Sequence, residues 1–114
     1  MKVYGIKNCN TVKKALDWLA EHNVGYEFQD FKKFGVSMDK LNEWDEKAGY
    51  DKFMNKAGLT YKQLDPAVKE SIKTKEDALH LLQQKTSMIK RPVIEKDGFL
   101  YFGFNEEVYE KELL

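Results

Sequence analysis

Cysteine and proline are scarce in this sequence, and neither sign of charge is in excess. A single cysteine in 114 residues excludes an internal disulfide and a metal site built from several cysteines. Nineteen basic residues balance nineteen acidic ones, so the net charge gives no reason to expect nucleic-acid or membrane-surface binding. No apolar run approaches the roughly 18 residues that span a membrane, and no signal-peptide stretch opens the chain. We therefore expect a cytoplasmic protein without a nucleic-acid or membrane partner.

The composition nevertheless supports a folded core. Apolar residues make up 42% of the chain and aromatic residues 13%. A chain of this length buries roughly two thirds of the surface that its unfolded form exposes. No repeat, low-complexity tract or flexible linker interrupts it. We expect one domain over residues 1–114.

The first thirty residues have the pattern of two strands joined by a helix. Residues 2–6 form a short strand-like run, and residues 24–29 alternate as in a strand buried on one face. Between them, apolar side chains recur at the 3.6-residue period of a helix, for which Asn8 or Asn10 is the expected cap. Such a unit is normally parallel and right-handed. The single cysteine, Cys9, then lies where the first strand passes into the helix.

Residues 31–85 have a helical pattern, and three helices are expected there. Ser37 is a candidate cap for the first, which should end at Gly49. Asp65 followed by Pro66 is typical of a second helix start, because a proline at the first helical position loses no hydrogen bond. Thr74 opens the third.

The chain then returns to strands. Residues 93–95 and 99–102 flank Asp97-Gly98, a strong hairpin signal, and Asn105 is a candidate cap for a last short helix. The pattern predicts an α/β fold of the thioredoxin-like layout. It has a core of residues 1–30 and 86–114 with a four-stranded mixed sheet, and a helical subdomain inserted at residues 31–85.

Cys9 is the first candidate functional residue. A thiol reacts as its thiolate, and the free N–H groups and dipole of a helix N-terminus favour that anion. Lys2, Lys7, Lys13 and Lys14 add positive charge before the first acidic residue. The alternative is a buried cysteine kept for packing, as most lone intracellular cysteines are. The polar neighbours of Cys9 favour a solvated, functional thiol.

Lys90-Arg91-Pro92 is the second candidate element. A proline is tolerated at the first residue of a strand, and an X-Pro bond costs only about 0.5 to 1 kcal/mol to hold cis. Such a turn would present the Arg91 guanidinium as an anion-binding fork near Cys9. The alternative is a solvated loop with a trans proline, and the residues alone leave both open. Gly5 and Gly103 are expected to mark close backbone approaches.

Three segments together resemble a known family. They are Y-G-I-K-N-C-N-T near the start, I-K-R-P-V before the expected hairpin and F-G-F-N-E near the end. Their order and spacing, over essentially the whole chain, resemble the arsenate reductase and Spx superfamily, and most of all its small YffB-like members. The resemblance implies a thioredoxin-type core with a helical insertion, Cys9 as the active thiol and a cis Arg91-Pro92 bond facing it.

This sequence differs from the family pattern at positions that affect which activity we expect. The arsenate-reducing members surround their cysteine with three arginines, of which Arg91 alone matches here. Ala57 stands where the second is usual, and the adjacent Lys56 is a weaker substitute for a bidentate donor. The regulator members often carry a C-x-x-C switch and a basic tail. Here Val12 takes the second cysteine position, and the sequence ends without such a tail.

The leading hypothesis is a cytoplasmic monothiol oxidoreductase of the arsenate reductase-like type, with glutathione as co-substrate and no tightly bound cofactor or metal. Cys9 attacks or carries a mixed disulfide while Arg91 and Lys13 hold a glutathione carboxylate or another anion. An external small thiol or glutaredoxin must release the product. The alternatives are an Spx-like regulator that binds the RNA polymerase α C-terminal domain, and an arsenate reductase. The residues expected to line the substrate and glutathione site are Asn8, Asn10, Thr11, Lys13, Lys56 and Pro92.

Overall fold

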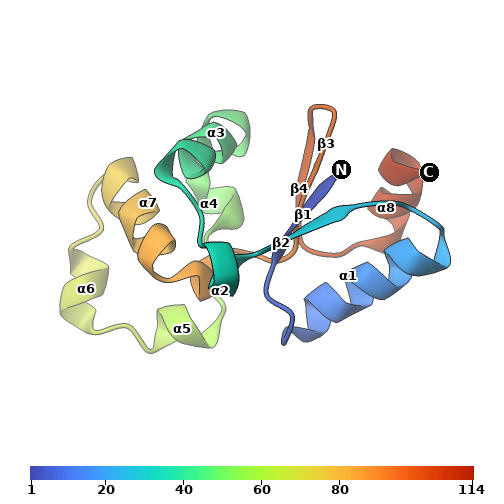
Figure 1. The fold of residues 1–114 in the computed structure, drawn as a ribbon. Coiled ribbons are helices and arrows are strands. Elements are labelled where there is room, and N and C mark those ends of the chain that lie inside the picture. The colour runs from blue at the N-terminus through green and yellow to red at the C-terminus, as the bar shows by residue number, and fades with distance from the viewer. The chain divides into compact units, whose positions relative to one another are not determined.

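The computed structural model describes residues 1–114, which divide into two compact units (Figure 1). The core unit comprises Met1–Phe34 and Arg91–Leu114, and the helical unit comprises Gly35–Lys90. The insertion thus begins and ends slightly later than the expected range 31–85. Phe31 belongs to the core unit because its ring stacks on Tyr4 with centroids 6.2 Å apart. That the two units form a single domain stays a prediction.

The core unit contains a four-stranded mixed sheet in the order β2-β1-β3-β4. Strand β1 pairs in parallel with β2 and antiparallel with β3, which pairs antiparallel with β4. This topology confirms the predicted fold class and the parallel opening unit. The elements of this unit are β1 (Lys2–Gly5), α1 (Asn10–Glu21), β2 (Glu27–Asp30), α2 (Phe31–Phe34), β3 (Val93–Lys96), β4 (Phe99–Phe102) and α8 (Glu106–Leu113).

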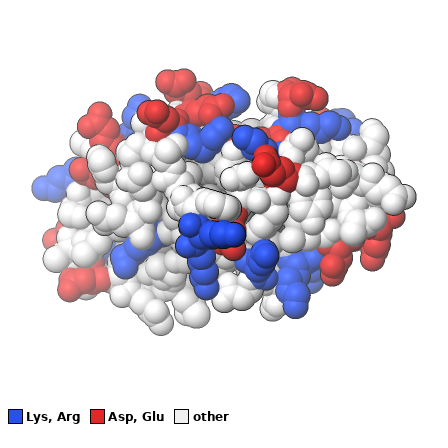
Figure 2. Space-filling view, viewed as in Figure 1, with Lys and Arg blue, Asp and Glu red and all other residues white.

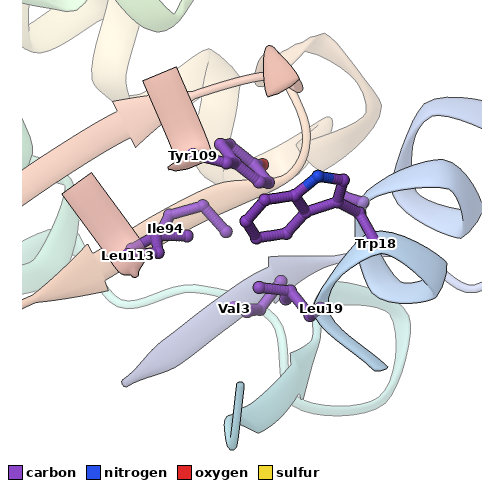
Figure 3. Packing of buried hydrophobic residues seen from close by; sticks show 7 residues of the cluster. Val3, Trp18, Leu19, Ile94, Tyr109 and Leu113 are labelled. Carbon is purple, nitrogen blue, oxygen red and sulfur yellow. The ribbon is translucent and has the colours of Figure 1, made fainter. Parts of the chain in front are cut away.

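Helices α1 and α8 pack against the same face of the sheet (Figure 1). Val3 and Ile94 lie opposite each other in the β1–β3 register, and both are fully buried. Trp18 of α1 meets Tyr109 of α8 edge to face, with ring centroids 5.4 Å apart (Figure 3). The cluster joins both helices to the sheet, and its buried members are Val3, Ala15, Trp18, Leu19, Ile94, Tyr109 and Leu113.

Several predicted turns and caps of the core unit are confirmed. Asp97 and Gly98 both have positive φ, 43° and 86°, as the two central residues of a type I′ hairpin turn require. The Asn105 side chain accepts a hydrogen bond from the N–H of Val108 and so caps α8. Helix α1 ends before Asn23, which has a φ of 56°. Strand β2 begins at Glu27, later than the alternation from residue 24 indicates.

The helical unit has more helices than the three that we expected. The extra ones are single turns of four residues, too short to show a hydrophobic period. The three predicted starts are nevertheless capped by Ser37, Asp65 and Thr74, the last in a capping box with Asp77. The elements are α3 (Met38–Ala48), α4 (Tyr50–Phe53), α5 (Leu59–Lys62), α6 (Pro66–Glu70), α7 (Lys75–Gln84) and a 3₁₀ turn at Thr86–Met88.

A second hydrophobic core holds the helical unit together. Trp44 and Phe53 are fully buried and meet edge to face with centroids 6.0 Å apart. The segment after α7 returns to this core, because the N–H of Asn55 donates to the carbonyl of Met88 and the N–H of Lys90 donates to that of Phe53. These contacts explain why the insertion extends to Lys90 rather than ending at residue 85.

Basic and acidic groups are both spread over the face of the molecule that Figure 2 shows. None of the helices combines the length and apolar character needed to cross a bilayer.

Candidate functional site

Cys9 is the N-cap residue of helix α1. Its backbone is extended, with φ −118° and ψ 125°, and its carbonyl accepts the first helical hydrogen bond from the N–H of Lys13 at 2.9 Å. The prediction that Asn8 or Asn10 caps this helix is therefore wrong, because Asn10 is already helical and Asn8 lies one residue too early. The Cys9 side chain makes no capping hydrogen bond. The first N–H groups of α1 thus remain free for an anion.

Close packing between β1 and α1 sets the position of this cap. Val12, in the first turn of α1, is fully buried, and a Cβ added to Gly5 would lie 3.0 Å from Val12 Cγ2. This confirms the expected close approach at Gly5. The half-buried Cys9 lies in the short connection between the two residues. The helix start is consequently held against the carboxyl end of β1.

Arg91 and Pro92 lie at the same end of the sheet as the Cys9 loop. Tyr4 pairs with Val93 in the antiparallel β1–β3 ladder, so β3 begins where β1 ends. The Arg91-Pro92 peptide bond is cis, as the family resemblance implies. The carbonyl of Pro92 accepts a hydrogen bond from the N–H of Gly103 at 2.8 Å. Sheet topology thus brings two sequence-predicted elements, 82 positions apart, to one end of the core unit.

The guanidinium of Arg91 has an unsatisfied donor. Its Nη1 atom is buried and makes no hydrogen bond. Leaving a buried donor unpaired costs about 1–3 kcal/mol, so such an atom marks a position that an external acceptor would complete. Arg91 is also the single arginine of the sequence. Arg91 is therefore the one side chain that can offer a planar, two-pronged set of N–H donors to an anion at this end of the core unit.

The other predicted residues differ in their surroundings. Asn8, Asn10, Thr11 and Lys13 are exposed around the start of α1. Pro92 is buried. Their roles in binding stay predictions.

Lys56 belongs to the helical unit. Its Nζ lies 3.9 Å from a carboxylate oxygen of Asp51, and both side chains are largely exposed. No group of three or more His, Cys, Asp or Glu side chains is arranged to hold a metal ion. The contribution of Lys56 to an anion site stays a prediction.

Sequence reasoning missed the support behind Pro92. Gly103, whose N–H binds the Pro92 carbonyl, has a φ of 104°, and its own carbonyl accepts the Tyr109 hydroxyl at 2.7 Å. A Cβ at Gly103 would meet no atom within 4 Å, so its positive φ, and not a close approach, accounts for glycine there. A glycine directly after an expected strand was the available signal.

Tyr109 should make stability depend on alkaline pH. Burial, with a smaller contribution from Tyr101, raises the pKa of the Tyr109 phenol well above its ordinary value. Because this pKa is higher in the folded state, the protonated phenol contributes its full stabilisation below about pH 10, which is its pKa in the unfolded chain. That stabilisation is lost as the pH rises further. Above pH 10 we expect the unfolding free energy of the wild type to fall faster than that of Tyr109→Phe, by up to about 1.4 kcal/mol per pH unit.

Urea titrations of both proteins between pH 7 and 11 measure this difference. At pH 7 the Tyr109→Phe variant should be about 1 kcal/mol less stable, because the Gly103 carbonyl loses its donor. Parallel pH profiles for the two proteins would contradict the prediction.

Comparison with known proteins places the whole chain in one family. The model of the ArsC family matches residues 4–112. An uncharacterized protein of Haemophilus influenzae is 44% identical over 108 residues, which cover 95% of this chain and 94% of that protein. The global transcriptional regulator Spx 1 of Oceanobacillus iheyensis is 23% identical over 107 residues, covering 92% of this chain and 80% of the regulator.

The fold agrees with solved structures of the same group. The structure of the YFFB protein superposes with a TM-score of 0.93 at 40% identity, covering 99% of this chain and 98% of that one. This similarity supports the thioredoxin-like core with its helical insertion. The chain has a thiol oxidoreductase-like fold and belongs to the ArsC family.

Proposed function

We propose that this protein is a monothiol oxidoreductase that acts on glutathione mixed disulfides through Cys9. The observation that carries the proposal is the pairing of two unfilled features at one end of the core unit. These features are the uncapped N-terminus of α1 at Cys9 and the buried, unpartnered Nη1 of Arg91. The first favours a sulfur anion, and the second favours a carboxylate on the molecule that the sulfur attacks.

The proposed reaction proceeds by two thiol–disulfide exchanges. The Cys9 thiolate attacks the glutathione sulfur of a mixed disulfide, so that a Cys9–glutathione disulfide forms and the other thiol leaves as a thiolate. A second glutathione thiolate then attacks that disulfide, releasing oxidised glutathione and restoring the Cys9 thiolate. The net change converts one mixed disulfide and one glutathione into one free thiol and oxidised glutathione.

The residues around Cys9 have separate tasks in this reaction. The free N–H groups at the start of α1 stabilise the sulfur anion. Arg91 and Lys13 hold glutathione carboxylates, and Asn8, Asn10 and Thr11 supply polar contacts at the same end. Because Cys9 is the single cysteine, no internal thiol can resolve the intermediate, and glutathione or glutaredoxin must do so.

Intact mass spectrometry after incubation with oxidised glutathione tests the proposal. We expect one glutathione adduct, located on Cys9 by peptide mapping and removed by reduced glutathione. The Cys9→Ser variant should show no adduct. A folded wild-type protein that stays unmodified while free cysteine in the same tube reacts would overturn the proposal.

A second candidate function is suggested by the similarity to Spx regulators. In that case the fold presents a surface to the C-terminal domain of the RNA polymerase α subunit, and Cys9 is not required. Val12 stands at the position of a second switch cysteine and is fully buried, so a C-x-x-C switch is not part of this candidate. Copurification with that domain by both wild type and Cys9→Ser, without thiol turnover, would favour it.

Arsenate reduction is the third candidate. It predicts turnover with glutathione and glutaredoxin that collapses in Arg91→Ala, and an inactive wild type would remove it. A tetrahedral oxyanion is best held by several bidentate donors, and this chain supplies a single arginine. The arginine count therefore favours a disulfide substrate over arsenate.

A further inference from the structure

A groove on the core unit lies between helix α1 and the segment that leads from β4 into α8. It has a volume of about 390 Å³ and involves neither Cys9 nor Arg91. On α1 its lining residues are spaced i, i+3, i+4 and i+7, so they form one stripe along the helix. The lining consists of Lys14, Asp17, Trp18, Glu21, Phe104 and Glu106.

The floor of the groove is aromatic and includes an unused hydrogen-bond donor. Trp18 is only 4% exposed, its ring stacks on His22 with centroids 3.9 Å apart, and its indole N–H donates to no group within the chain. Figure 3 shows the indole nitrogen on the edge of the ring opposite Val3 and Leu19. Phe104 is half-buried and meets Tyr109 edge to face at 5.1 Å. The indole nitrogen is not a buried unpaired atom, so its N–H reaches the surface and is open to an acceptor from outside the chain.

The rim of the groove is acidic. Asp17, Glu21 and Glu106 are exposed, and none of the three carboxylates forms an ion pair. Lys14 supplies the single positive charge of the rim, so the lining carries an excess of two negative charges. Figure 2 shows a blue group followed by red ones along the lower right, where Figure 1 draws α1. The groove therefore favours a cationic ligand.

We propose that this groove binds an arginine side chain presented by a partner polypeptide. A guanidinium is planar, so it can pair with the rim carboxylates through two N–H groups and stack on the face of Phe104. A backbone carbonyl next to that arginine can accept a hydrogen bond from the Trp18 indole N–H. A simple amine would satisfy the carboxylates but offer no acceptor to the indole N–H, so a peptide fits the groove better than a free cation.

Two-dimensional ¹H–¹⁵N NMR with a short arginine-containing peptide tests this proposal. The indole signals of Trp18 and Trp44 are well separated from the backbone signals, and Trp44, buried in the helical unit, serves as an internal control. We expect a saturable shift of the Trp18 indole signal and none for Trp44. A peptide with citrulline in place of arginine has nearly the same shape without the charge and should produce no shift.

Variants that neutralise carboxylates test whether the rim of the groove contributes to peptide binding. Glu21→Gln with Glu106→Gln should weaken binding about fivefold, whereas Glu110→Gln with Glu112→Gln removes two exposed carboxylates of α8 outside the groove and should leave it unchanged. An unshifted Trp18 signal, or equal shifts with the citrulline peptide, would overturn the proposal. Equal affinity for a lysine peptide would overturn the assignment to arginine. Cys9→Ser should bind the peptide as the wild type does. Loss of peptide binding would therefore contradict this proposal without bearing on the thiol chemistry, and the reverse also holds.

Discussion

The Cys9→Ser variant is expected to show no catalysed turnover of a glutathionylated peptide, with a rate equal to that of the uncatalysed exchange with glutathione. Serine cannot form the mixed disulfide, and the chain has no second thiol to replace Cys9. The measurement is release of the free peptide thiol at fixed glutathione concentration. It applies to the folded protein, because this substitution is not expected to harm the fold.

The stability of the Cys9→Ser variant shows whether the substitution leaves the fold intact. Serine is a preferred N-cap, whereas Cys9 makes no side-chain capping hydrogen bond. Cys9→Ser should therefore be as stable as the wild type or more stable by about 0.5–2 kcal/mol in urea unfolding. Turnover that survives in a properly folded Cys9→Ser protein would contradict the proposed chemistry.

Replacing Arg91 with methionine is expected to lower the turnover of glutathione mixed disulfides by about 10- to 100-fold. That range corresponds to the loss of about 1.5–3 kcal/mol for hydrogen bonds to a charged group. Methionine keeps an unbranched side chain while removing every donor. Arg91→Lys should lie in between, because an ammonium offers a point charge without the planar fork.

The same substitution should not destabilise the protein. The buried Nη1 of Arg91 has no partner in the folded chain, so its removal relieves an unsatisfied donor. Unfolding in urea should show Arg91→Met to be at least as stable as the wild type. The matched control is Lys90→Met, which removes the adjacent exposed cation and should leave turnover unchanged. A large loss of stability in Arg91→Met, or an equal effect in Lys90→Met, would contradict the assigned role.

The parts of the fold that the sequence predicted are those with strong local signals. Ser37, Asp65, Thr74 and Asn105 each cap the helix expected of them, because their short polar side chains reach nearby backbone N–H groups. Asp97-Gly98 forms the expected hairpin for a similar reason. These features depend on interactions within a few residues.

The errors arose where tertiary contacts outweigh local preference. Asparagine is a better N-cap than cysteine, yet Cys9 takes that position. Burial of Val12 over Gly5 fixes where α1 begins, and this contact appears in the sequence only as a glycine and a valine. The single-turn helices α4 and α5 likewise have no period to detect.

The candidate site likewise has one part that local sequence predicts and one part that depends on the fold. Cys9 and its neighbours are contiguous, so their grouping follows from the sequence. Arg91 reaches the same end of the sheet through the β1–β3 pairing, which local patterns cannot specify and which the family resemblance supplied. The brace formed by Gly103 and Tyr109 behind Pro92 depends on hydrogen bonds between separate elements. Only the folded core unit brings these residues together.

The central claim is that Cys9 and Arg91 act on one bound molecule, and the rate of adduct formation with two disulfides tests it most directly. Oxidised glutathione carries carboxylates, whereas hydroxyethyl disulfide is neutral. We predict that Arg91→Met slows formation of the Cys9 adduct about 10- to 100-fold with oxidised glutathione and leaves the reaction with hydroxyethyl disulfide essentially unchanged. Equal slowing with both disulfides, or no slowing with either, would contradict the claim.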